Sequence, residues 1–117
     1  MIDERRAVPR VTCILPVRLY PQDTVVVIQT LTRDLGAHGT QVVTTQPIPN
    51  DAPVSIELCL EPGEAPLTLL GRAVWHRAIP NSQQFHQGVA FSTLSEHITR
   101  LMSGYIRKIQ ERTIQSV

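Results

Sequence analysis

The sequence predicts a mainly β domain, an antiparallel barrel or sandwich with one helix packed on it. Two observations predict this class. Strand-like runs separated by short, turn-rich connections fill most of the chain, and helical periodicity occurs only near the C-terminal end. The length of 117 residues is that of a single domain, and no linker or repeat divides it. The sheet is expected to close, because closure protects strand edges.

The first half of the chain contains three of the six expected strands. Residues 11–20 place apolar side chains at alternate positions, which is typical of a strand with one face in a core. Residues 24–34 are rich in β-branched side chains. After a break at 35–39 that contains two glycines, residues 40–45 resume an extended run, and the proline-rich residues 46–53 form a loop.

The second half contains the other three strands, at residues 54–60, 67–79 and 85–91. The turn between the first two contains Gly63, which can adopt a positive φ without steric cost. Gly71 lies inside the long middle strand and predicts a bulge or bend there.

The C-terminal segment has helical periodicity, and a helix is expected over residues 94–113. Thr93 followed by Glu96 predicts a capping box at its start. Gly104 is expected to let the helix lie close against a strand. The apolar stripe expected to face the barrel consists of Ile98, Leu101, Met102, Tyr105, Ile106 and Ile109.

Composition excludes several classes of protein. Eleven basic and ten acidic residues give a net charge of +1, and aromatic content is 4%, so a binder of long nucleic acids is not expected. Cys13 and Cys59 lie in separate apolar runs without metal-ligand spacing and are expected to be reduced core thiols. No apolar run approaches the length of a membrane span, and a cytoplasmic location is the default expectation.

Catalysis is not expected. Glu57, Glu61 and Glu64 surround a turn, where carboxylates are simply solvated. Neither cysteine has a histidine at a known motif spacing, and no serine lies in a nucleophile elbow.

Three arginines crowd the N-terminal end of this nearly neutral chain. Arg6 and Arg10 are separated by three residues that include Pro9, which favours an extended segment, and Arg5 lies directly beside Arg6. Because guanidinium groups suit phosphate oxygens, this segment could fold over a bound anion. The alternative is a solvated basic terminus.

A second candidate region is the run RDLGAHGTQV at residues 33–42. Asp34 ends a strand and offers a carboxylate that can accept hydrogen bonds from a ligand or brace an arginine. Gly36 and Gly39 can let backbone N–H groups turn toward a ligand, and His38 could add partial charge there. The alternative is an ordinary glycine-containing connection.

Together these features resemble the PilZ domain family. The resemblance rests on their order: the RxxxR arginine pair, the run from Asp34 to Gly39, the segments GRAVWHR (71–77) and FHQGVAF (85–91), and an amphipathic C-terminal helix. It covers nearly the whole chain. RxxxR alone has little specificity, whereas the ordered combination is much more specific.

The resemblance implies a six-stranded antiparallel barrel that binds cyclic di-GMP. In the family the two RxxxR arginines, which correspond to Arg6 and Arg10, clamp phosphates and contact guanine. The second family motif, Asp/Asn-x-Ser-x-x-Gly, corresponds to Asp34, Gly36 and Gly39. Gly36 replaces the serine, and the loss of one neutral hydrogen bond typically weakens binding by up to about tenfold.

The resemblance also implies roles for Arg5 and Trp75. Arg5 matches an arrangement that accompanies two stacked ligand molecules in the family, and the ligand stoichiometry stays open. Trp75, the only tryptophan, matches a position that can lie against guanine. Strict alternation puts it on the same face as Ala73 and Arg77, so a core tryptophan is the equal alternative.

The expected organisation is a flexible N-terminal arm at residues 1–10 and a PilZ-like barrel at residues 11–117. The expected function is a cyclic di-GMP receptor that changes conformation on binding and signals to a protein partner. No cofactor is implied, and homodimerisation through the exposed side of the helix stays open. The alternative is a degenerate PilZ-like adaptor that no longer binds nucleotide.

Overall fold

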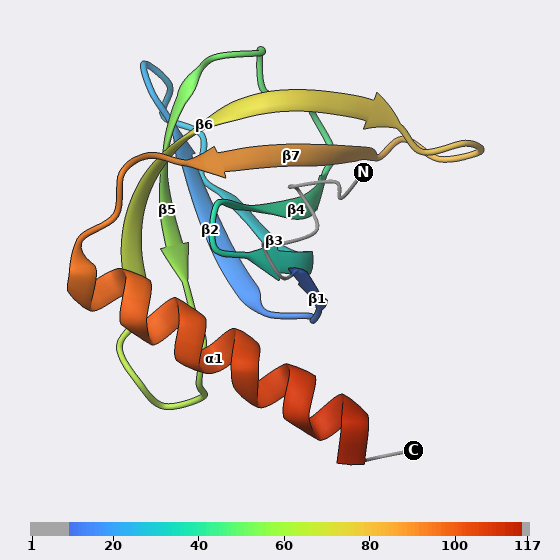
Figure 1. Ribbon diagram of the computed structural model, residues 1–117. Coiled ribbons are helices and arrows are strands. Elements are labelled where there is room, and N and C mark those ends of the chain that lie inside the picture. The colour runs from blue at the N-terminus through green and yellow to red at the C-terminus, as the bar shows by residue number, and fades with distance from the viewer. Residues whose placement is uncertain (1–9, 116–117) are drawn as a thin grey trace, which may run out of the picture.

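A computed structural model describes residues 10–115, with side chains through residue 112. It contains a barrel of β-strands with one long helix lying across the end of the barrel (Figure 1). The strands are β1 (Arg10–Thr12), β2 (Pro16–Pro21), β3 (Ile28–Gly36), β4 (Gly39–Thr44), β5 (Pro53–Leu58), β6 (Leu67–Ala78) and β7 (Phe85–Phe91), and the helix is α1 (Glu96–Gln115).

The sheet closes on itself. Strands β3, β2, β5, β6, β7 and β4 are neighbours in that order, and an additional β3–β4 pairing completes the ring. Every pairing is antiparallel. The short β1 pairs with the end of β3 and is an extra strand outside the ring. The prediction of a six-stranded antiparallel barrel with a C-terminal helix is therefore confirmed.

The first predicted strand, residues 11–20, divides into β1 and β2. Its predicted alternation is confirmed, because Val11, Leu15, Val17 and Leu19 are all buried. The interruption is bridged by Thr32 of β3, whose hydroxyl donates to the Cys13 carbonyl at 2.7 Å and accepts from the Leu15 N–H at 2.9 Å. Backbone hydrogen bonds from the Thr32 N–H to the Leu15 carbonyl and from the Cys13 N–H to the Arg33 carbonyl lie beside these side-chain bonds, so β3 holds both sides of the interruption.

The second predicted strand was placed too early in the chain. β3 begins at Ile28, which pairs with Leu19, instead of at residue 24. The valines at 25–27 lie in the β2–β3 loop, and Val25 is fully exposed. High β propensity does not form a strand where no neighbouring strand supplies partners.

Two glycine predictions in the second half had different outcomes. Gly63 has φ 82°, as expected for the turn before β6. The predicted bulge at Gly71 is wrong, because Gly71 pairs regularly with Val54. A Cβ at Gly71 would lie 2.4 Å from the Ala90 carbonyl oxygen, so glycine permits close strand packing there.

The helix begins two residues later than predicted and runs to Gln115 instead of 113. Its N-cap is Ser95, whose hydroxyl accepts from the Ile98 N–H at 3.2 Å, and not Thr93. Gly104 is exposed with open space beside it, so the predicted close approach to a strand is wrong.

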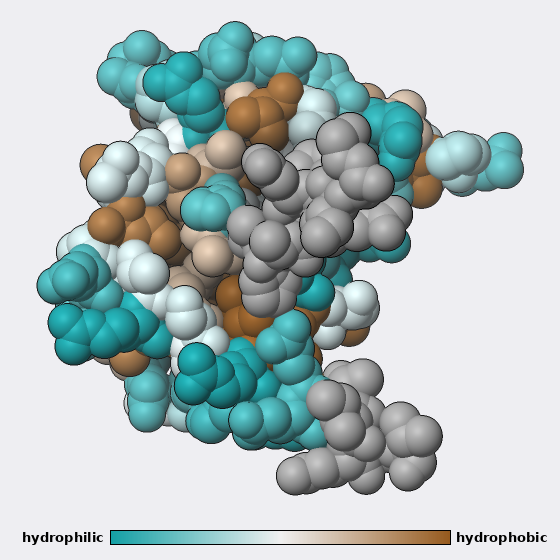
Figure 2. Space-filling model, viewed as in Figure 1, coloured by the Kyte–Doolittle hydropathy of each residue, from teal (hydrophilic) through white to brown (hydrophobic). Residues whose placement is uncertain are grey.

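The predicted apolar stripe of the helix does face the barrel. Met102 and Ile106 are buried, Tyr105 is partly buried, and Leu101 at the margin is 40% exposed. α1 packs against β1 and β3. Figure 2 shows hydrophobic residues between the helix and the barrel, whereas the outer side of the helix is largely hydrophilic. Within the described part of the chain, no helix is long and apolar enough to cross a membrane.

Candidate ligand-binding face

Strands β1, β3, β4, β7 and β6 lie side by side and form one outer wall of the barrel. Two of these pairings carry irregularities, one between Thr32 and Asp34 of β3 and one between Ala73 and Trp75 of β6. We call this wall the bulged face. Its outward side chains include Arg10, Arg33, Asp34, Gln41, Trp75 and Arg77.

The β3 irregularity places two consecutive charged residues on the outside. Thr32 and Leu35 are buried, at 2% and 0% exposure, and Arg33 and Asp34 both lie between them on the outer side. Strict alternation would have turned one of the pair inward. Because β-bulges re-aim side chains in this way, the carboxylate of Asp34 becomes available at the surface.

Asp34 connects three strands through its carboxylate. Oδ1 accepts from Arg10 Nη2 of β1 at 2.7 Å and from the Gln41 backbone N–H of β4 at 3.0 Å, and Oδ2 accepts from Gln41 Nε2 at 3.1 Å. The side chain of Arg10 is 46% exposed and that of Asp34 is 21% exposed. Such a pair adds little stability, but it fixes the direction of the Arg10 guanidinium.

The strand register places Asp34 and Trp75 in one cross-strand row. Asp34 lies opposite Gln41, Gln41 opposite Gly88, and Gly88 opposite Trp75. The sequence predicted that Trp75 shares a face with Ala73. This is wrong, because Ala73 is fully buried inside the barrel whereas the bulge at Val74 turns Trp75 to the outer wall.

Trp75 lies flat over Gly88. A Cβ added to Gly88 would lie 2.2 Å from the indole Nε1, so only glycine leaves room for the ring in this position. The Arg77 guanidinium lies 5.9 Å from the centroid of the ring, within the range of a cation–π contact. The core alternative for Trp75 is thereby excluded, since the side chain is half-buried on the outside.

Gln87 supports this arrangement from inside the barrel, and sequence reasoning missed it. Its side chain is fully buried, Nε2 donates to the Trp75 carbonyl at 2.7 Å and to the Gly88 carbonyl at 3.2 Å, and Oε1 accepts from the Ile48 N–H at 3.0 Å. The only available clue was a glutamine at an inward position of a strand. Gln87 thus satisfies the carbonyl that the β6 bulge frees.

The two glycines of the candidate motif lie at strand ends. Gly36 ends β3 opposite Arg10, and Gly39 begins β4. Neither has a positive φ. A Cβ at Gly39 would lie 2.5 Å from the Val89 carbonyl oxygen, so this glycine permits the close contact between β4 and β7.

Comparison with known proteins agrees with this geometry. The PilZ domain model matches residues 4–108. The chain belongs to the PilZ domain family. No curated protein matches it.

Solved structures share this fold at low identity. The Bacillus subtilis inhibitor of motility (MotI/DgrA) has a TM-score of 0.78 and 18% identity, covering 95% of this chain and 53% of the inhibitor. The PilZ domain with c-di-GMP of YcgR from Escherichia coli has a TM-score of 0.73 and 12% identity, covering 96% of both chains. The K. pneumonia MrkH–c-di-GMP complex has a TM-score of 0.77 and 14% identity, covering 99% of this chain and 57% of MrkH. This PilZ domain therefore spans only about half of the inhibitor and of MrkH.

Some predicted site residues remain outside the candidate face of this PilZ domain. Arg5 and Arg6 lie outside the described residues, as does most of the predicted arm at residues 1–10. His38 is exposed at the β3–β4 turn, where its carbonyl accepts from the Phe91 N–H at 2.8 Å. Of the predicted ligand residues, the structure brings Arg10 and Asp34 into contact, and it places Trp75 in the same cross-strand row as Asp34.

The structure also shows what surrounds the cysteines and two of the three glutamates that the sequence analysis considered. Cys13 and Cys59 are free and only partly buried, so they border the core instead of lying inside it. Burial is the main cause that raises the pKa of Cys13. Glu57 accepts from the Tyr20 hydroxyl and Glu61 pairs with Lys108 at 3.0 Å, so these two are not merely solvated. No group of three metal-ligating side chains occurs among the described residues.

Proposed function

We propose that this PilZ domain is a receptor for cyclic di-GMP that binds the ligand on the bulged face. The observation that carries the proposal is the Arg10–Asp34 pair, held by Gln41 in one row with an outward tryptophan. On this face Arg10 suits a phosphate, Asp34 suits the guanine edge and Trp75 suits the guanine face. Two structures with this fold, those of YcgR and MrkH, contain c-di-GMP, which also supports the proposal.

Each site residue has a proposed role. Arg10, together with Arg5 and Arg6, binds phosphate oxygens and contacts guanine. Asp34 accepts from the guanine N–H groups or keeps Arg10 directed at the phosphate. Trp75 offers its exposed ring to a guanine face.

Gly36 and Gly39 keep the β3–β4 turn free of side chains beside the ligand. Gly36 also removes the hydroxyl that the family motif provides, and we expect weaker binding on that account. The same substitution is the observation that favours the alternative function, a PilZ-like adaptor that binds a protein and no nucleotide.

The proposed mechanism is an order–disorder switch of the predicted arm up to residue 9, because Arg10 already lies in β1 and contacts Asp34. Binding free energy from the arginine contacts offsets the conformational entropy of fixing these residues over the ligand. The closed segment and the neighbouring barrel wall then form a surface for a protein partner in the cytoplasm. No catalysis is part of this mechanism, and the oligomeric state is left open.

Calorimetric titration of cyclic di-GMP tests the proposal. The wild type is compared with Arg6→Ala/Arg10→Ala and with Arg72→Ala, a control that removes an exposed β6 arginine outside the row, and GTP serves as a ligand control. We expect saturable binding at micromolar concentration or tighter, lost in the double variant and retained in Arg72→Ala. The fitted stoichiometry gives one or two ligands per chain.

Absence of binding heat in the wild type at high protein concentration would favour the adaptor. Equal binding by the wild type and the double variant would contradict the assigned site. Protease cleavage within residues 1–10 tests the switch, because the proposal requires protection of these bonds by saturating ligand.

A further inference from the structure

Two further arginines of the bulged face meet at one histidine. Arg33 Nη1 of β3 lies 2.7 Å from His86 Nδ1 and 2.9 Å from His86 Nε2 of β7. Arg77 of β6 is the direct cross-strand neighbour of His86. Three strands therefore bring two positive charges to the same place. The sequence did not predict this cluster, since its members are far apart along the chain and the β3 bulge presents Arg33.

Neither arginine is neutralised within the described residues. Among the described residues, no carboxylate forms an ion pair with Arg33 or Arg77. Both side chains are exposed. The pKa of His86 is lowered, by burial first and then by Arg33 and Arg77, so His86 is neutral at pH 7 and can accept a hydrogen bond from Arg33. The cluster thus keeps two positive charges with no paired carboxylate among the residues that the structure describes.

The cluster is continuous with the row that contains Asp34. Arg77 lies over the Trp75 ring, and Trp75 belongs to that row. Beside Arg33, an open groove of about 610 Å³ extends along β3 to Thr12, two residues from Arg10. Its lining includes exposed apolar side chains and several neutral polar ones but no carboxylate: Thr12, Ile14, Leu31, Arg33, Val43 and Gln84.

We propose that Arg33 and Arg77 form a second phosphate-binding position, separate from that of Arg6 and Arg10. This position takes a phosphate of the cyclic dinucleotide bound beside Trp75, an assignment that rests on the proposed function. Strands β3 and β6 are separated by β4 and β7, so their backbones are about 14 Å apart at a spacing of about 4.7 Å per strand. Two long side chains, Arg33 in contact with His86 and Arg77 opposite His86 in the ladder, can span this distance and hold one anion between their guanidinium groups.

Two variants test this position on the full chain. Arg33→Ala/Arg77→Ala removes both guanidinium groups, and Arg33→Lys/Arg77→Lys keeps the charges but removes the planar forks. Arg72→Ala is the matched control, because it removes an exposed arginine of β6 that is outside the cluster. Circular dichroism confirms that each variant is folded before binding is measured.

Cyclic di-GMP is the first probe. By calorimetry we expect the alanine pair to raise the Kd about tenfold or more, the lysine pair to raise it less, and Arg72→Ala to leave it unchanged. An alanine pair that binds cyclic di-GMP like the wild type would overturn the proposal.

Inorganic phosphate is the second probe, with the fluorescence of Trp75, the only tryptophan, as readout at constant ionic strength. We expect a saturable change in the wild type and in Arg6→Ala/Arg10→Ala, and none in Arg33→Ala/Arg77→Ala. If the wild type binds no cyclic di-GMP, the proposed function fails while a phosphate response that needs Arg33 and Arg77 still supports the second position. A wild type without any phosphate response would overturn the second position.

Discussion

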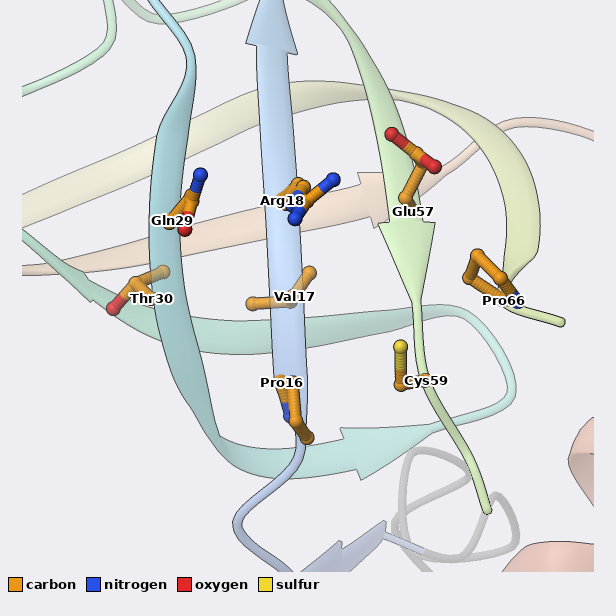
Figure 3. Close-up of a pocket in the computed structure, with 8 residues that line it drawn as sticks. All are labelled: Pro16, Val17, Arg18, Gln29, Thr30, Glu57, Cys59 and Pro66. Carbon is orange, nitrogen blue, oxygen red and sulfur yellow. The ribbon is translucent and has the colours of Figure 1, made fainter. Parts of the chain in front are cut away.

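The bulged face and the wall on the other side of the barrel both consist of antiparallel strands, but they differ in which residues lie opposite their charged side chains. On β2 and β5, Arg18 lies directly opposite Glu57, and Glu57 accepts a hydrogen bond from the Tyr20 hydroxyl. Figure 3 shows Arg18 between Gln29 and Glu57, three of the residues that line a pocket of about 370 Å³. We call this wall the regular face.

The difference follows from the strand registers. The β2–β5 pairing runs without interruption from Val17 to Pro21, so each outward side chain has a cross-strand neighbour that can complement it. On the bulged face, two irregularities leave Arg33 and Val74 without a direct partner in the ladder. The regular register thus places an acid directly opposite Arg18, whereas the bulge leaves Arg33 without a cross-strand partner and available for a ligand.

Removing one acid from each face gives the largest expected contrast. Asp34→Ala takes the partner from Arg10 and removes the carboxylate proposed for guanine, so we expect the Kd for cyclic di-GMP to rise about 10- to 100-fold, as for a charge-assisted hydrogen bond. Glu57→Ala should leave the Kd unchanged. Calorimetry on both variants measures the contrast, and equal effects would abolish the distinction between the two faces as binding surfaces.

Gly39→Ala tests the close contact between β4 and β7 on the bulged face. The new methyl group would meet a backbone oxygen at 2.5 Å, which cannot rotate away, so we expect the free energy of unfolding to fall by about 3 kcal/mol. Urea denaturation measures it. Gly104→Ala is the control, because open space beside the helix predicts a gain of up to about 1 kcal/mol. A neutral Gly39→Ala would contradict the close β4–β7 contact.

Gln87→Ala tests the internal support of the β6 bulge. It leaves the Trp75 carbonyl and the Ile48 N–H without their side-chain partner, so we expect a loss of about 1–2 kcal/mol in unfolding free energy. The fluorescence of Trp75 should shift as well, since the bulge positions this ring. The exposed Gln84, replaced by alanine, should change neither quantity. Unchanged fluorescence in Gln87→Ala would show that the bulge persists without this glutamine.

The smallest expected effect is a pH dependence from His86. The folded protein lowers its pKa, through burial first and then Arg33 and Arg77, below the ordinary value of 6.5. As pH falls below about 6.5, unfolded chains therefore take up a proton before folded ones, and stability decreases. His86→Gln should flatten this part of a stability–pH curve measured by thermal melts. A curve identical to that of the wild type would contradict the shift.

Periodicity and turn chemistry were sufficient to predict the class of this fold. The alternation in residues 11–20 follows the buried side chains, and the apolar stripe of the helix was also predicted correctly. Boundaries were less accurate, because they depend on partners that are distant in sequence. Thr32 interrupts the first strand, and the end of β2 delays the start of β3 until Ile28.

The candidate site was predictable only as a set of residue types. The Arg10–Asp34 contact matches the expectation that Asp34 could brace an arginine. The orientation of Trp75, the outward position of Arg33 and the support from Gln87 were not predictable from a period of two, because bulges change that period at single residues. The positions of Trp75, Arg33 and Gln87 can be explained only when the strand register is known.

The bulge at Val74 also has a consequence for how such a protein can change. In a closed ring of strands, one residue inserted or deleted in β6 exchanges the side chains on the two surfaces of the wall beyond that point. Val74 is itself the extra residue: without it, Ala73 and Trp75 would pair with Val89 and Gly88 as consecutive residues, and the only indole of the chain would stay on the outer wall. A regular ladder that kept Val74 would instead pair Val74 with Gly88 and direct the indole toward the interior. Gain or loss of a nucleotide platform can therefore arise from the strand register alone, and two chains with identical motifs can differ in this respect.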